Sequence, residues 1–404
     1  MEGAGMKKAA IIMPALLPMP PVKGGAVETL VDGILKENEK STGVVFHVFG
    51  IYDEAAATAA KEYQNTQFKM VSVSQTLKRA EHFVFRVFKK LFGIEIGEDR
   101  EYIHRVLSVV KQGSYDAVVV ENDAYFTYRA AKALKGVQIF SHIHNDIINS
   151  NDIYAKRILK RGVQVITVSR YIKERVMTVK TAADSAVSVL LNCTDLSAFG
   201  REKYEPFRNE FRQKHNVGPE GKLFVFAGRV IPEKGVLELA RDFVKVKNKN
   251  TYLLIVGSGW FSQNISDPYL EQVRATLKDV SDRIIFTGYV PFEQMPKFYA
   301  AADVAVLPSI WEEPASLTVL ESLATGLPLI TTDAGGVAET ANENCAFILK
   351  RDEKLVDNLA CCMDVLSANS EVCIKMERNA KQNVKDRNFH EYYKKFITMI
   401  FTKP

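Results

Sequence analysis

The sequence predicts an α/β protein built from two domains, each with a doubly wound parallel sheet. At 404 residues the chain is too long for a single hydrophobic core, which favours about two domains. Short apolar runs alternate with amphipathic helical stretches, as in parallel sheets that are covered by helices. This alternation occurs twice, before and after a polar segment at 200–221 that we interpret as a linker with a short helix.

Composition narrows the classes of partner. The net charge of +5 fits anionic small molecules, a membrane surface or nucleic acid equally well. Outside the segment 75–92, no basic stripe with stacking aromatic residues is evident, so we expect no nucleic acid partner. The opening residues lack a signal-peptide pattern, and no apolar run reaches the ~18 residues of a membrane span. We therefore expect a cytoplasmic protein that is soluble or peripheral at a membrane.

The five cysteines form no Cys-x-x-Cys pair and have no metal-ligand spacing with histidine. This usage favours reduced, inert thiols without a metal. Cys361 and Cys362 are adjacent within an apolar helical pattern, and we predict that both lie in the core.

The first domain opens with a buried strand and a glycine loop. Lys7 to Met13 reads as the strand, and Gly24 and Gly25 precede a helix over about 27–37. Glycine has no Cβ, so backbone at this loop can approach a ligand closely. The loop is not a Gly-x-Gly-x-x-Gly fingerprint, which makes a dinucleotide site a weak interpretation. A plain tight turn is the alternative.

Two histidines stand at the end of a later strand. Further strands are predicted at 44–49, 68–71, 117–121 and 138–142. After the last of them comes Ser-His-Ile-His-Asn-Asp, in which alternation places His142 and His144 on the same side of an extended chain. Carboxyl ends of parallel strands are where such sheets bind ligands, so His144 is a candidate ligand contact. The alternative is that each histidine is satisfied by neighbouring backbone.

The first domain closes with a strand and a turn. Another strand is predicted at 164–168, and Asn192 and Asp195 follow a strand near 188–191. We interpret these two polar side chains as structural, since they can satisfy the backbone of the connection between domains. The first domain is predicted to span 1–198.

The second domain, predicted at 199–383, is another parallel sheet. Its strands are predicted at 223–227, 252–256, 284–287, 304–307 and 329–332. Loops at the strand ends contain Gly-Arg-Val-Ile-Pro-Glu-Lys-Gly at 228–235, Gly-Ser-Gly at 257–259 and Gly-Tyr-Val at 288–290. Each of the two shorter loops, taken alone, indicates only a turn.

A helix near the C-terminal end carries the strongest chemical pattern. Ser316 is a good N-cap after Pro314, and the helix is predicted over 317–325. A helix N-terminus presents unpaired N–H groups and a positive dipole end, which suits phosphate. Glu313 lies just before that end and Glu321 two turns inside, so the pair suits a ligand with hydroxyl groups on both sides of a pyrophosphate. The alternative is an ordinary capped helix with two solvated glutamates.

Two of these stretches carry a resemblance to a known family. The stretch Glu313-Pro314 to Glu321 resembles the Glu-Pro-x-x-x-x-x-x-Glu pattern of retaining glycosyltransferases of the GT-B fold, in particular family 4, also called glycosyl transferases group 1. The stretch 226–235 resembles that family's strand end and loop, whose Arg and Lys hold the nucleotide diphosphate. The resemblance covers nearly the whole chain and implies two Rossmann-like domains that face a central cleft. Ala315-Ser316 departs from the usual Phe-Gly, which leaves the identity of the sugar open.

The resemblance also implies roles for individual residues. Its catalytic positions are Arg229, Lys234, Glu313 and His144. Its donor-binding positions are Gly24, Gly25, Gly257, Gly259, Tyr289, Val290, Ser316, Leu317, Thr318 and Glu321. Arg229 and Lys234 would stabilise the leaving diphosphate, Glu321 would bind the ribose, and Glu313 and His144 would contact the donor sugar. No Asp-x-Asp motif is evident at a strand end, so no metal or other cofactor is expected.

The implied activity is transfer of a sugar from a nucleotide-diphosphate donor, a UDP-sugar, to an acceptor hydroxyl with retention of configuration. The acceptor would be a carbohydrate or a lipid-linked sugar in cell-surface polysaccharide or glycoconjugate synthesis. One alternative is a nucleotide-sugar epimerase or hydrolase on the same fold, and another is a nucleotide-sugar-binding protein without catalysis.

Two helical stretches remain. The amphipathic, aromatic helix at the C-terminus is expected to cross back onto the first domain with the segment 384–404, as in the GT-B architecture. The stretch 75–92 interleaves basic residues with phenylalanines and suits a helix on an anionic bilayer, at the inner face of the plasma membrane. The alternative is that its phenylalanines belong to the core.

Overall fold

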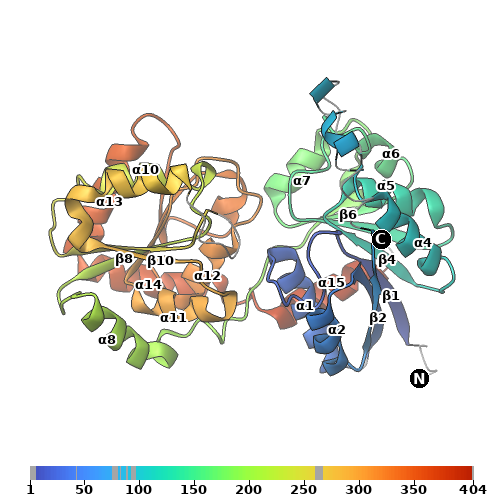
Figure 1. Ribbon diagram of the computed structural model, residues 1–404, viewed down its shortest axis with the longest axis horizontal. Helices are drawn as coiled ribbons and strands as arrows, with labels where there is room; N and C mark the ends of the chain where they lie inside the picture. Colours follow the sequence, from blue (N-terminus) through green and yellow to red (C-terminus); the bar gives the residue numbers. More distant parts are fainter. Residues whose placement is uncertain are drawn as a thin grey trace. The chain divides into compact units, whose positions relative to one another are not determined.

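The chain forms two compact α/β units. The computed structural model describes residues 6–41, 43–74, 81, 83–87, 90–91, 97–259 and 267–402. The first unit comprises Met1–Asn192 together with Phe389–Pro404, and the second comprises Cys193–Asn388 (Figure 1). The units therefore meet in the sequence at Asn192, earlier than the predicted end at residue 198. The segment 200–221 belongs to the second unit.

The first unit contains a seven-stranded parallel sheet in the order β3-β2-β1-β4-β5-β6-β7. Its strands are β1 (Lys7–Ile12), β2 (Val44–Ile51), β3 (Thr66–Val71), β4 (Ala117–Glu121), β5 (Gln138–Ile143), β6 (Gln164–Thr167) and β7 (Val187–Val189). Its α-helices with described bounds are α1 (Ala26–Glu39), α2 (Glu54–Ala59), α4 (Arg100–Val110), α5 (Ala124–Ala133), α6 (Ala155–Leu159), α7 (Arg170–Met177) and α15 (Phe389–Phe401). The strand order reverses between β1 and β4, and ligands bind at such a switch point.

The second unit contains a six-stranded parallel sheet in the order β10-β9-β8-β11-β12-β13. Its strands are β8 (Lys222–Ala227), β9 (Thr251–Val256), β10 (Ile284–Gly288), β11 (Val304–Leu307), β12 (Leu329–Thr332) and β13 (Ala346–Leu349). Its α-helices with described bounds are α8 (Glu205–Lys214), α9 (Val236–Phe243), α10 (Pro268–Thr276), α11 (Met295–Ala301), α12 (Leu317–Thr325), α13 (Leu355–Ala368) and α14 (Ser370–Val384). This order reverses between β8 and β11.

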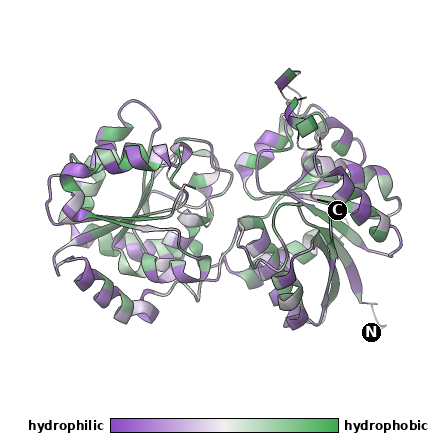
Figure 2. Cartoon of the chain, viewed as in Figure 1, coloured by the Kyte–Doolittle hydropathy of each residue, from purple (hydrophilic) through white to green (hydrophobic). Residues whose placement is uncertain are grey.

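The hydrophobic core of each unit forms around the apolar strands of its sheet. The central strands are buried on both faces, and Figure 2 shows hydrophilic residues gathered on the helices that cover the sheets. The prediction of two parallel-sheet domains is confirmed. Strand β13 was missed, because its run of four apolar residues is short and only its first residue is fully buried. The prediction for the cysteine pair is wrong for Cys361, which is exposed on α13, while Cys362 is half-buried.

The last helix, α15, packs on α1 within the first unit. The Phe389 ring occupies the space where a Cβ on Gly33 would stand, 1.9 Å from the ring, so α1 needs glycine there. The Tyr393 hydroxyl donates to Asn38 Oδ1 at 2.8 Å. Tyr392 and Phe396 of the same helix are buried. The chain thus returns to its first unit after completing the second.

None of the helices among the described residues is long and apolar enough to cross a membrane. Most of the predicted interfacial stretch 75–92 lies outside the described residues, which include only 81, 83–87 and 90–91 of it.

Candidate functional site

Parallel sheets bind ligands at the carboxyl ends of their strands, and we call this side of each sheet its ligand edge. In the second unit it is built from loops that touch through their backbones. Gly257 has φ 142°, and a Cβ there would lie 1.8 Å from the Gly228 carbonyl oxygen. The Gly257 N–H donates to the Gly288 carbonyl at 3.0 Å, and Val230 N–H donates to the Ser258 carbonyl at 3.0 Å. The loops after β8, β9 and β10 are therefore held side by side with little side-chain volume between them. This arrangement leaves their backbones open to a ligand at the strand ends.

The loop after β8 also packs on the loop after β11. Gly235 has φ 68°, and a Cβ there would stand 1.9 Å from the Pro308 carbonyl oxygen. The Ile310 N–H donates to the Glu233 carbonyl at 3.0 Å. Only glycine fits this contact, so the last residue of the 228–235 loop is fixed by the close approach of the two backbones.

That contact brings two predicted catalytic residues together. Lys234 Nζ lies 2.5 Å from Glu313 Oε1, and the Ser309 hydroxyl donates to the same oxygen at 2.6 Å. Glu313 is only 4% exposed, while Arg229 in the same loop is exposed. A buried carboxylate needs such partners, because burial without them would be costly. The charged pair is thus a built feature of the site, and Ser309 is a partner that sequence reasoning missed.

Helix α12 begins and ends at the predicted residues. The Ser316 hydroxyl accepts from Val319 N–H at 3.4 Å, and Gly326 ends the helix with φ 88°. The amides of its first turn, which include Leu317 and Thr318, have no intrahelical acceptor, as at helix N-termini that bind anions. The prediction of a capped helix over 317–325 is confirmed.

Glu321 points into the second unit and is 4% exposed. The Tyr299 hydroxyl of α11 donates to Glu321 Oε2 at 2.9 Å, and Tyr299 is fully buried. Burial raises the pKa of Glu321 to about 7, and the tyrosine hydrogen bond only partly opposes this rise. Because both Glu313 and Glu321 are buried, the alternative of two solvated glutamates is wrong.

Four more of the predicted donor-binding positions follow the ends of β9 and β10. A Cβ on Gly259 would meet Asp267 Oδ2 at 2.0 Å, so the aspartate side chain packs directly against this glycine. Tyr289 is 44% exposed, and Val290 beside it is half-buried. An exposed aromatic side chain next to a glycine turn offers a flat surface for a ring.

The ligand edge of the first unit contains the predicted glycine pair. Gly24 and Gly25 have φ 72° and 111° and lead into α1. A Cβ on Gly25 would lie 2.1 Å from Glu28 Oε2, so the backbone of the loop packs directly against this carboxylate. Glu28 is 4% exposed, and its burial raises the pKa of the carboxyl group. The helix begins one residue before the predicted range, at Ala26.

The two predicted histidines share one carboxylate that sequence reasoning missed. Glu121 ends β4 and is fully buried. Its Oε2 lies 3.0 Å from His142 Nδ1 and 3.0 Å from His144 Nε2. The alternative that neighbouring backbone satisfies the histidine rings is therefore wrong. A glutamate at the end of the apolar run 117–120 was the available signal, since a charged residue there lies at the ligand edge.

The main chain of His144 is held by the same strand end. Asn122 has the left-handed φ of 47°, and its side-chain oxygen accepts from His144 N–H at 2.9 Å. The Asn122 N–H in turn donates to the His142 carbonyl at 2.8 Å. Asparagine tolerates this backbone conformation, which explains the Glu-Asn sequence.

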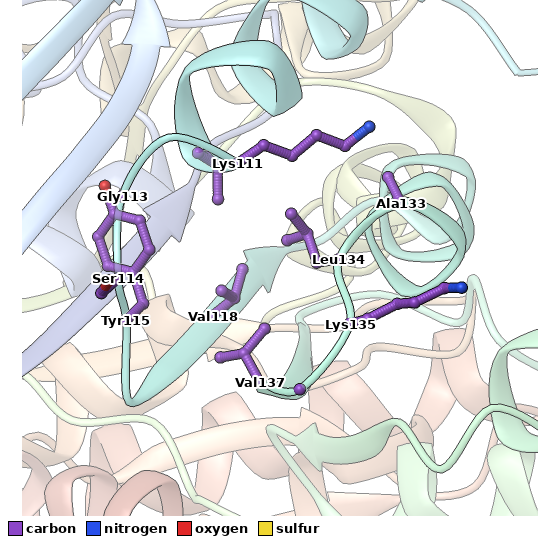
Figure 3. Close-up of a pocket in the computed structure, with 11 residues that line it drawn as sticks. Lys111, Gly113, Ser114, Tyr115, Val118, Ala133, Leu134, Lys135 and Val137 are labelled. Atoms are coloured by element: carbon purple, nitrogen blue, oxygen red, sulfur yellow. The ribbon is translucent and has the colours of Figure 1, made fainter.

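A cavity lies at the opposite edge of the first sheet. Its volume is about 440 Å³, and it opens between the α4–β4 and α5–β5 connections (Figure 3). Val118, Leu134 and Val137 line it, and Lys111 and Lys135 border it. Because it lies at the amino ends of the strands, it is separate from the ligand edge.

Comparison with known proteins agrees with this architecture. Residues 207–383 match the model of the family Glycosyl transferases group 1. The chain is 25% identical over 385 residues to the putative glycosyltransferase YtcC of Bacillus subtilis (strain 168), covering 93% of this chain and 87% of that protein. It is 23% identical to the lipopolysaccharide 1,2-N-acetylglucosaminetransferase of Salmonella typhimurium (strain LT2), covering 83% of this chain and 82% of that protein.

Solved structures share the fold at low sequence identity. The structure of Anabaena Alr3699/HepE in complex with UDP has a TM-score of 0.74 and 16% identity, and covers 98% of this chain and 100% of that one. The structure of WaaG, a glycosyltransferase involved in lipopolysaccharide biosynthesis, has a TM-score of 0.68 and 15% identity, with coverages of 98% and 100%.

The fold is GT-B, with two Rossmann-like units, and the family match together with the named relatives supports a glycosyltransferase. The match to glycosyl transferases group 1 covers residues 207–383, which lie in the second unit.

Proposed function

We propose that the protein transfers a sugar from a UDP-sugar to a hydroxyl group, with retention of configuration and without a metal ion. The observation that carries this proposal is the pair of Lys234 and Glu313 in the second unit. Lys234 lies in the loop between β8 and α9, and Glu313 lies just before α12. A fixed cation and a helix N-terminus from neighbouring strand ends suit the two phosphates of the donor.

The proposed chemistry depends on charge that develops on the leaving group. As the glycosidic bond breaks, negative charge builds on the diphosphate, and Arg229 and Lys234 would stabilise it together with the first amides of α12. Lys234 is bound to Glu313 in this structure. Donor phosphate would compete for the lysine, and Glu313 would then accept a hydrogen bond from a hydroxyl of the donor sugar.

The other positions bind the donor in this proposal. Glu321 would accept hydrogen bonds from the ribose, and these are strongest when the carboxyl group is ionised. The loops at Gly257 and Tyr289 would contact the nucleoside, while Gly24, Gly25 and His144 of the first unit would contact phosphate and sugar. UDP is the proposed nucleotide because the similar fold of Anabaena Alr3699/HepE was solved with UDP.

The acceptor would be a carbohydrate or a lipid-linked sugar in synthesis of a cell-surface polysaccharide or glycoconjugate. Relatives support this class, since one is named a lipopolysaccharide transferase and another a putative teichuronic acid biosynthesis glycosyltransferase of Bacillus subtilis (strain 168).

The experiment begins with thermal shift against a panel of nucleotide sugars, because a ligand that binds only the folded state raises its stability. The best donor is then tested for transfer, with the anomeric configuration of the product read by NMR. Lys234→Ala should lower turnover by about 10²-fold, the effect of removing one preorganised charge donor. Lys245→Ala is the matched control, because Lys245 pairs with Asp357 on the surface of the same unit.

Chelation separates the metal-free proposal from its alternative. Turnover should persist in EDTA, and its loss with recovery on adding Mn²⁺ or Mg²⁺ would contradict the proposal. Conversion of the donor to an isomer or to free sugar without any acceptor would favour an epimerase or a hydrolase.

We also propose that the stretch 75–92 binds an anionic membrane at the inner face of the plasma membrane. Among its described residues, Phe83 and Leu91 are 68% and 67% exposed, which suits insertion into a bilayer surface. The protein should bind anionic vesicles at low salt and be released as salt screens its charge. Charge reversal of Lys89 and Lys90 should weaken binding, whereas reversal of Lys111 and Lys135 should not. Equal binding to neutral vesicles would contradict this proposal.

A further inference from the structure

The first unit contains a buried chain of four polar side chains that the proposed transfer chemistry does not use in full. It runs from Tyr392 on α15 through His142 and Glu121 to His144, and it joins the C-terminal helix to the ligand edge. Tyr392 is 3% exposed, and His142 and Glu121 are fully buried. Groups this deeply buried are stable only when each donor meets an acceptor.

The distances define which atoms meet. Glu121 Oε2 lies 3.0 Å from both His142 Nδ1 and His144 Nε2, and the two imidazole rings are 4.3 Å apart. The second nitrogen of His142, Nε2, lies 3.4 Å from the Tyr392 hydroxyl. One carboxylate oxygen therefore bridges two histidines, and a tyrosine bonds the far side of one of them.

The proton positions follow from the acceptor. An ionised carboxylate only accepts hydrogen bonds, so both nitrogens that face Glu121 carry a hydrogen. The coulombic and hydrogen-bond effects of both histidines overcome burial and lower the pKa of Glu121 to about 2, which keeps it ionised. Burial, with repulsion from His142, lowers the pKa of His144 despite its bond to Glu121, so this ring is neutral near pH 7. A neutral ring that bears its hydrogen on Nε2 has Nδ1 as an acceptor.

The same hydrogen-bond chain also gives both ring nitrogens of His142 a partner. Its Nδ1 faces Glu121 and its Nε2 lies 3.4 Å from the Tyr392 hydroxyl, so each nitrogen of this ring has a polar partner. Glu28 also faces this cluster from α1, and its charge would repel that of Glu121. Burial raises the pKa of Glu28, which reduces this repulsion.

We propose that Glu121 is a positioning residue that fixes His144 as the neutral Nε2–H tautomer, so that Nδ1 accepts a hydrogen bond from a ligand hydroxyl. The group that His144 binds is then a sugar hydroxyl and not a phosphate oxygen, which carries no hydrogen to donate. This assignment of the ligand rests on the proposed function, whereas the tautomer is a property of the protein alone. The Asn122 contact fixes the main chain, and Glu121 fixes the ring.

The test reads the tautomer directly. In the full-length protein labelled with ¹⁵N in its histidine rings, NMR at pH 7 should show His144 with a protonated Nε2 and an unprotonated Nδ1. Assignment uses His144→Asn. Protonation at Nδ1, or an imidazolium, overturns the proposal without reference to any activity. Since the spectrum is recorded on the unmodified protein and its assignment needs no Glu121 variant, a failure of a Glu121 variant to fold does not prevent the measurement.

The second experiment measures sugar transfer by the Glu121→Gln variant. We expect the KM for the donor sugar to rise on the order of tenfold, the effect of losing one hydrogen bond to a charged group, with the affinity for UDP within about twofold. The control is Tyr115→Phe, which removes the partner of His47 at 2.9 Å on the same sheet and should change neither value. An unchanged KM in Glu121→Gln would overturn the positioning role.

The measurements also separate this inference from the proposed function. Absence of sugar transfer by the unmodified protein would refute the proposed function, while the NMR result would still decide the tautomer.

The three ligand atoms of Glu121, His142 and His144 lie within 4.8 Å of one another, a spacing that a divalent cation could use. One equivalent of tightly bound metal, found by elemental analysis after EDTA treatment, would make the cluster a metal centre and overturn the proposal.

Discussion

Two glutamates at the ligand edges of the two units are buried to the same degree and behave in opposite ways. Glu121 in the first unit is 0% exposed, and Glu321 in the second is 4% exposed. Glu121 meets two histidines, whereas Glu321 meets the hydroxyl of Tyr299. The pKa of Glu121 falls to about 2, and that of Glu321 rises to about 7.

The comparison shows that partners and not burial decide the charge of these groups. Burial alone raises a carboxyl pKa, because the charged form loses its solvation. The two histidines attract the charge of Glu121 and also donate hydrogen bonds to it. A tyrosine only donates a hydrogen bond, which does not offset the burial of Glu321.

The largest expected difference is in stability at pH 7. Glu121→Gln should lower the opening free energy of the β4 and β5 amides by roughly 3–5 kcal/mol, because it breaks a buried charged network. Glu321→Gln should not lower that of the α12 amides, since the amide oxygen still accepts from Tyr299 and no charge is buried. Amide hydrogen exchange measures the opening free energy in each unit separately. Similar losses in both variants would remove the contrast.

The second prediction concerns pH. Glu321 has a raised pKa, so its contribution to stability is full below about 4.5 and is lost as pH rises through about 7. The free energy of unfolding, taken relative to Glu321→Gln, should fall on the order of 3 kcal/mol over this range. For Glu121 the sign is opposite: its contribution is present above about 4.5 and is lost as pH falls toward about 2. Denaturant titrations of parent and variant at several pH values test both slopes, and a flat difference for Glu321 would contradict its raised pKa.

The third prediction separates Glu321 from Glu313 by ligand. Glu321→Gln should weaken UDP and UDP-sugar alike by roughly 1.5–3 kcal/mol, because both ligands contain the ribose. Glu313→Gln should leave UDP affinity nearly unchanged and reduce transfer, since its proposed partner is the donor sugar. Calorimetric titration beside a transfer assay makes the comparison. Values within about twofold of the parent for both variants would refute the proposed roles of these carboxylates.

The smallest expected effect is that of Tyr299→Phe. Loss of the hydroxyl removes the hydrogen bond that favours the ionised form, so the pKa of Glu321 should rise further and UDP affinity at pH 7 should fall by about 1 kcal/mol. The effect should shrink at higher pH, where Glu321 ionises in both proteins. The control is Ser367→Ala, which removes the buried hydroxyl partner of Thr251 at 2.9 Å where β9 begins. A loss in the control as large as that in Tyr299→Phe would indicate general destabilisation.

The sequence by itself determined the features that depend on neighbouring residues. Alternating apolar runs and helices predicted two parallel sheets, and Ser316 with Gly326 predicted both ends of α12, because a cap acts within one helical turn. The glycines at 235 and 257 belong to loops that the sequence pointed out, although the carbonyl oxygens that exclude a Cβ there became visible only in the fold.

Only the tertiary structure decided which charged groups meet. Lys234 and Glu313 are 79 residues apart, and Tyr392 lies 250 residues from His142. Pairing β4 with β5 sets Glu121 opposite His142, and this register brought in a glutamate that no local pattern linked to the histidines. The charge of a buried carboxyl group depends on such partners, so the opposite pKa shifts of Glu121 and Glu321 could not be predicted from two similar residues in a sequence.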